Sequence, residues 1–158
     1  MNSTSANDGQ ALSEKQWATL RAIADLIVPP SEKYQVPGAG DPAICENVLK
    51  DASNRFERLR AALATLDEMA VEAHGRFFAD LDPASRESVG LTFQSEHPRP
   101  AAMLETLVTQ CYYRDDRVLA SLGMAVRPPF PEGYDVEEGD WSVLDTVRQR
   151  APFHRPTS

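Results

Sequence analysis

The 158-residue sequence has few of the residues that build catalytic or metal centres, with only three histidines and two cysteines. No HExxH or Glu-x-x-His pattern occurs, since Val71 stands three residues before His74. Gly38-Ala39-Gly40 comes closest to a dinucleotide loop, but position 43 is alanine and no strand precedes it. Walker and GxSxG motifs are also missing. We therefore predict no catalytic residue, no cofactor and no metal in this chain.

Other absences limit the partners and the compartment. The formal net charge is −8, and a negative surface repels the phosphates of nucleic acids, so no nucleic-acid partner is predicted. No run approaches the ~18–20 apolar residues that a membrane span needs. Residues 1–12 look like a disordered polar leader without a signal region. This predicts a cytoplasmic chain as it stands, with a periplasmic location open for a processed form or one exported with a partner.

The two cysteines, Cys45 and Cys111, are too few and too far apart for a disulfide framework or a CxxC motif. We expect both to act as small apolar side chains, at least partly buried. A single bridge, or a bond to a partner in an oxidising compartment, stays open as the alternative.

Helical signals dominate the rest of the sequence. Ser13 and Gln16 form a capping box at the start of a helix, and Pro29-Pro30 ends that helix. Asp41-Pro42 and Asp82-Pro83 each pair a capping residue with proline at the first helical position. Strand signals are nearly absent, so the predicted fold class is all-α.

The longest predicted helix has apolar residues spaced alternately three and four apart. They are Phe56, Leu59, Leu63, Leu66, Ala70, Ala73 and Phe77. We expect this seam to pack on helices of the same chain; a seam for another chain is the alternative. A second helical face runs through Leu104, Leu107, Val108, Cys111 and Tyr112, and a brief helical turn ends at Gly123.

After Gly123 the character of the sequence changes. Residues 124–139 contain three prolines and an acidic patch without helical or alternating period. Because prolines favour extended chain, we predict a stiff arm here. Asp140 then caps a last helix that carries Trp141, Leu144 and Val147. The prediction is an irregular helical bundle over 13–123, followed over 124–158 by an extended proline-rich arm, a short helix and a tail.

Aromatic and arginine side chains gather in this C-terminal third, and such residues are enriched in interface cores. We predict that a partner contacts Tyr112, Tyr113, Arg127, Pro128, Phe130, Pro131, Gly133, Tyr134, Phe153 and Arg155. The alternative is that the arm packs back on its own helices, and both can hold along different stretches.

The order of these motifs resembles the small subunit, subunit three, of gluconate 2-dehydrogenase-type enzymes over roughly residues 13–156. The resemblance is carried by the opening helix (12–30), Pro37-Gly38-Ala39, Tyr112-Tyr113-Arg114-Asp115-Asp116, Leu122-Gly123, Pro128 to Tyr134 and the final helix leading to Arg155. It implies a small helical subunit without a redox centre. Many such subunits begin with a twin-arginine signal, which this sequence does not show.

The resemblance also implies a role. The chain is expected to bind, stabilise and help mature a large flavoprotein of the glucose–methanol–choline type, which oxidises sugars, sugar acids or polyols. FAD and the catalytic residues are expected in that partner, and a third, haem-bearing subunit stays open. Two other readings remain from the residues alone: a stand-alone helical enzyme with a dispersed carboxylate or histidine site, and a generic helical adaptor.

Overall fold

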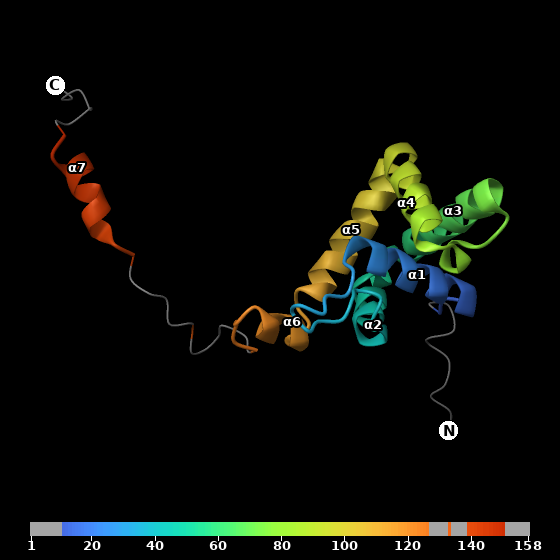
Figure 1. The fold of residues 1–158 in the computed structure, drawn as a ribbon, viewed down its shortest axis with the longest axis horizontal. Coiled ribbons are helices and arrows are strands. Elements are labelled where there is room, and N and C mark those ends of the chain that lie inside the picture. The colour runs from blue at the N-terminus through green and yellow to red at the C-terminus, as the bar shows by residue number, and fades with distance from the viewer. Residues whose placement is uncertain (1–10, 127–132, 134–138, 151–158) are drawn as a thin grey trace. The chain divides into compact units, whose positions relative to one another are not determined.

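The computed structural model describes residues 11–126, 133 and 139–150. The chain divides into two compact units, residues 1–126 and 127–158. The described part of the first unit contains α1 (Glu14–Ile27), α2 (Pro42–Asp51), η1 (Ser53–Arg55), α3 (Phe56–His74), η2 (Phe78–Asp80), α4 (Pro83–Glu96), α5 (Pro98–Tyr112) and α6 (Asp116–Ser121). The second contains η3 (Trp141–Leu144) and α7 (Asp145–Arg148) (Figure 1).

The all-α prediction is confirmed for the described residues. Their only extended pairing is one isolated bridge, between Ser31 and Val36. Within the first unit, α1 contacts all four of α2, α3, α4 and α5, so the other long helices are arranged around it (Figure 1). No described helix is long and apolar enough to cross a membrane.

The predicted helix starts are confirmed atom by atom. Ser13 Oγ accepts from the Gln16 N–H at 3.3 Å, and Gln16 Oε1 accepts from the Ser13 N–H at 3.1 Å. The carboxylates of Asp41 and Asp82 accept from backbone N–H groups in the first turns of α2 and α4. These bonds satisfy donors that have no partner inside the helix, which is why each helix begins there.

The predicted seam of α3 is confirmed in part. Phe56, Leu59, Leu63, Leu66 and Ala70 are buried in the same chain, as the favoured alternative required. The extension to Ala73 and Phe77 is wrong: Ala73 lies in the helix without being buried, and Phe77 lies beyond the helix, which ends at His74 because Gly75 takes a left-handed φ of 67°. Ala73 is exposed, and Phe77 is 38% exposed outside the helix. Glycine adopts this φ without a Cβ clash and so stops the helix.

One buried cluster joins the helices of the first unit. Leu20 of α1, Val48 of α2, Leu63 of α3, Phe93 of α4 and Leu107 of α5 all belong to it. Fully burying a side chain of this size contributes roughly 1.5–3 kcal/mol. The core therefore holds the first unit together without a disulfide, and both cysteines are free thiols inside it.

The described part of the second unit is short. Asp140 Oδ1 accepts from the Ser142 N–H at 2.9 Å, which confirms the predicted cap. The predicted helix begins as the 3₁₀ turn η3 and continues for four residues as α7. The predicted disordered leader falls mostly, and the predicted arm partly, outside the described residues.

Candidate functional site

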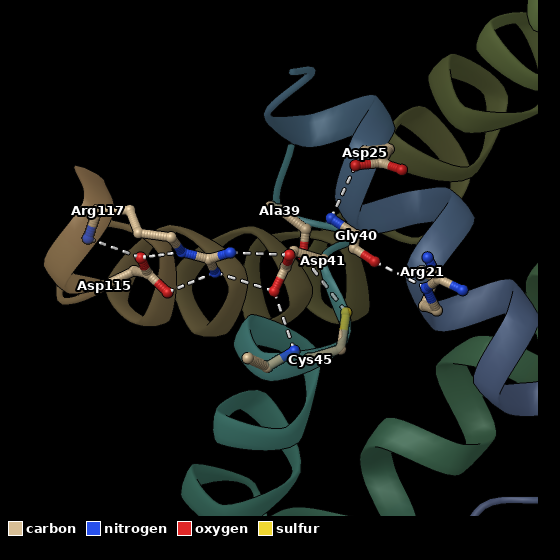
Figure 2. A network of polar contacts seen from close by, with 9 residues as sticks. Arg21, Asp25, Ala39, Gly40, Asp41, Cys45, Asp115 and Arg117 are labelled. Atoms are coloured by element: carbon tan, nitrogen blue, oxygen red, sulfur yellow. Dashed lines mark hydrogen bonds and ion pairs between the residues drawn. The ribbon is translucent and has the colours of Figure 1, made fainter. Parts of the chain in front are cut away.

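The most extensive polar network of the described residues surrounds the turn at residues 37–41, which follows α1. Asp25 Oδ1 accepts from the Gly40 N–H at 2.8 Å, and Arg21 Nε donates to the Gly40 carbonyl at 2.7 Å (Figure 2). Arg21 and Asp25 lie one turn apart on α1, so both reach the same peptide unit. A Cβ at Gly38 or Gly40 would overlap the Asp25 carboxylate. Glycine at these positions is therefore required by close approach to α1.

The same turn continues into a second set of contacts. The guanidinium of Arg117 lies between two carboxylates that cap different helices, Asp41 of α2 and Asp115 of α6 (Figure 2). Its Nη1 and Nη2 donate to Asp41 at 3.0 and 2.9 Å, while Nε and Nη2 donate to Asp115 at 2.9 and 2.8 Å. Such two-point pairing is among the stronger ion-pair geometries, although Arg117 is half-exposed. One side chain thus joins two helix starts.

These contacts set the protonation of the network. Hydrogen bonds from Arg117 hold the pKa values of Asp41 and Asp115 below their usual range, although partial burial opposes the effect. The two carboxylates in turn raise the pKa of Arg117 above its usual value. All three groups are therefore charged at neutral pH. They bind one another and neither donate nor accept a proton there.

Burial keeps both cysteines in the protonated thiol form. Cys45 Sγ donates to the Ala39 carbonyl at 3.3 Å, and burial raises the pKa of this thiol to about 12 (Figure 2). Burial also raises the pKa of Cys111, although Arg114 opposes it. Since the thiolate is the reactive form, the raised pKa values keep both sulfurs mainly as unreactive thiols at neutral pH.

The structure describes three of the ten predicted interface residues. Tyr112 is only 4% exposed and lies in the core, while Tyr113 is 54% exposed. Their rings meet edge to face with centroids 5.2 Å apart. Gly133 is half-buried, with a left-handed φ of 67°. The remaining seven lie outside the described residues: Arg127, Pro128, Phe130, Pro131, Tyr134, Phe153 and Arg155. Of the described positions, Tyr113 has the exposure that a docking residue needs.

Sequence reasoning missed the central residue of the network. Arg117 and Asp41 are 76 positions apart, and no local pattern connects them. The Asp115-x-Arg117 spacing at a helix start was the available signal for half of the contact. The network brings together the 37–41 turn and the acidic end of the segment that begins at Tyr112, two features on which the resemblance rested.

No group of three or more His, Cys, Asp or Glu side chains in the described residues is placed to hold a metal ion. His74 is exposed at the end of α3, consistent with a surface role. Within the described residues, no cofactor site is evident either. The described part of the chain is therefore a small all-α protein, and its most extensive polar network connects its own helices.

Comparison with known families identifies the family of this protein. The family model described as gluconate 2-dehydrogenase subunit 3 matches residues 14–123, about two thirds of the chain, and the chain belongs to this family. The family is that of a small subunit of a dehydrogenase complex. No curated protein and no solved structure matches the chain. The match ends at Gly123, so the Pro128 to Tyr134 motif, on which much of the resemblance rested, lies beyond it.

Proposed function

We propose that this chain is the non-catalytic small subunit that binds, stabilises and helps mature a large FAD-dependent dehydrogenase of sugars, sugar acids or polyols. Membership of the family supports the dehydrogenase complex as the setting. The large subunit supplies FAD and the catalytic groups, and the small one supplies binding surface.

The observation that carries the proposal is the exposure of the second unit's apolar side chains. Trp141, Val143, Leu144 and Val147 are 64%, 69%, 38% and 54% exposed, and no residue of 139–150 is buried. Exposed apolar side chains at this density mark interaction sites in soluble proteins. An isolated helical segment this short is also unstable in water, and docking on a partner would stabilise it.

Binding alone is sufficient for the proposed role. A partner that binds the folded flavoprotein but not its unfolded chain stabilises it by about 4 kcal/mol at a thousandfold excess over Kd. A permanent interface of this kind buries on the order of 2,000 Å² or more. The predicted contacts at Arg127, Phe130, Tyr134 and Phe153 would add to the contacts that Trp141 and its neighbours make with the partner.

Co-expression tests the role directly. A flavin-dependent large subunit of such a complex is produced with and without this chain, and soluble yield, flavin absorbance and dehydrogenase activity are compared. We expect the large subunit alone to be poorly folded and low in FAD. Equal folding, flavin content and activity without this chain would end the proposal.

Side-chain replacements localise the interface. Trp141→Ala, and Phe130→Ala with Tyr134→Ala, should each weaken the complex while the thermal midpoint of this chain alone stays nearly constant. Tyr34→Ala serves as the control, because Tyr34 is 57% exposed and belongs to the first unit. If Trp141→Ala lowers the midpoint and leaves the complex intact, the second unit packs on its own chain and is no docking segment.

A further inference from the structure

A basic groove on the first unit, defined by Arg55, Arg58 and Arg99 with the apolar side chains between them, shares no residue with the polar network. It has a volume of about 810 Å³. Arg55 and Arg58 come from η1 and the first turn of α3, and Arg99 comes from the first turn of α5. Arg58, Ala62 and Thr65 recur at helical spacing, so α3 presents one continuous stripe to the groove.

The charge of this groove is opposite to that of the chain. Three arginines line it and no acidic residue does, in a sequence whose net charge is −8. Several arginines elsewhere have carboxylate partners: Arg60 pairs with Glu57, Arg114 with Asp51, and Arg117 with Asp41. In the described part of the chain, no carboxylate forms an ion pair with an arginine of the groove. Like charges gathered without partners repel one another, and an anionic occupant would relieve that repulsion.

The floor of the groove is apolar, which sets a second requirement for the occupant. Ala62 is only 3% exposed, and Met103 and Pro100 are half-buried. Small side chains on α3 leave the hollow, and arginines line it from two sides, Arg55 and Arg58 from η1 and α3 and Arg99 from α5. A guanidinium binds a carboxylate through two parallel hydrogen bonds. The fitting occupant therefore presents carboxylates together with apolar side chains.

We propose that the basic groove binds an acidic segment of the large dehydrogenase subunit, with Asp or Glu side chains on the arginines and an apolar side chain on the floor. This inference rests on the proposed function and adds a second contact surface to it. A nucleic-acid occupant is disfavoured, since the strongly negative chain would repel a long run of phosphates. A short acidic segment interacts chiefly with the local charge of the groove.

The test is the dissociation constant, measured by dilution, of the co-expressed complex of the large subunit with wild type, Arg58→Glu/Arg99→Glu or Arg76→Glu. Arg76 is exposed just after α3 and does not line the groove, so it reproduces a charge reversal without touching the site. At about 50 mM salt we expect the double variant to raise Kd by at least about tenfold. At about 0.5 M salt the difference should shrink, because screening weakens exposed ion pairs. Arg76→Glu should stay within about twofold of wild type at both salts.

Thermal midpoints of all variants are measured first; if charge reversal unfolds the chain, Arg58→Gln/Arg99→Gln replaces it. Failure of wild type to bind the large subunit would overturn the proposed function itself. Wild-type binding with an unchanged Kd for the double variant at low salt would overturn the groove alone. Calorimetry with inorganic pyrophosphate supplies the last arm. Stoichiometric binding that the double variant loses, without any change in the complex, would mean a small-anion site and overturn the peptide assignment.

Discussion

The two units of this chain differ in whether their large apolar side chains are buried. In the first unit the apolar faces of five helices meet in one cluster, and helix starts are closed by Ser13, Asp41, Asp82 and Asp115. In the second, residues 139–150 place four large apolar side chains in contact with solvent and bury none. The family match also covers the first unit and ends before the second. The first unit thus has one buried core, whereas the described part of the second leaves its large apolar side chains exposed.

The largest effect should come from the core of the first unit. Leu63→Ala removes a fully buried side chain at the centre of α3. We expect a loss of about 3 kcal/mol in the free energy of unfolding, because the lost burial is accompanied by a cavity. Chemical denaturation followed by circular dichroism measures it. A loss below about 1 kcal/mol would mean that the core repacks freely, and the contrast between the units would weaken.

The sequence was sufficient where the signal is local. The capping box at Ser13 and the Asp-Pro pairs can be read because donor and acceptor are two or three residues apart. The stop at Gly75 was also readable, since glycine directly follows a helix whose last residue is His74. The prediction followed the apolar spacing as far as Phe77 and so overlooked the stop at Gly75.

Tyr112 shows where two sequence patterns compete. Helical spacing placed it on the buried face with Leu104 and Val108, while its residue type suggested an interface. In the isolated chain the burial pattern decides its position. The contact of Arg117 with Asp41 could not be read at all, because 76 residues separate the partners and only the packed fold brings them together.

A smaller loss is expected from Gly40→Ala. The added Cβ would overlap the Asp25 carboxylate and the Arg21 carbonyl, so the turn or α1 must shift. We expect about 2 kcal/mol of destabilisation from overpacking. Gly139→Ala in the second unit is the matched control, because nothing lies within 4 Å of its added Cβ. Equal thermal midpoints for the two variants would mean that the 37–41 turn is as unconstrained as the second unit.

Arg117→Met should cost less, about 1 kcal/mol, since the guanidinium is half-exposed and solvent screens part of its attraction. The pH dependence is the sharper measurement. Asp41 and Asp115 have lowered pKa values in the folded chain, so their contribution is present above the unfolded value of about 4 and is lost as pH falls below it. Between about pH 4 and 2 the wild-type midpoint should fall more steeply than that of Arg117→Met. Parallel curves would mean that Arg117 does not lower these pKa values.

The smallest effect should come from Val143→Ala and Leu144→Ala in the second unit. Neither side chain is buried, so each change should alter the free energy of unfolding of the isolated chain by less than about 0.5 kcal/mol. The same denaturation experiment as for Leu63→Ala measures both units on one scale. A loss approaching that of Leu63→Ala would show that the second unit shares a core with the chain itself. A negligible loss leaves these side chains free to dock, and their removal should then weaken the proposed complex with the large subunit.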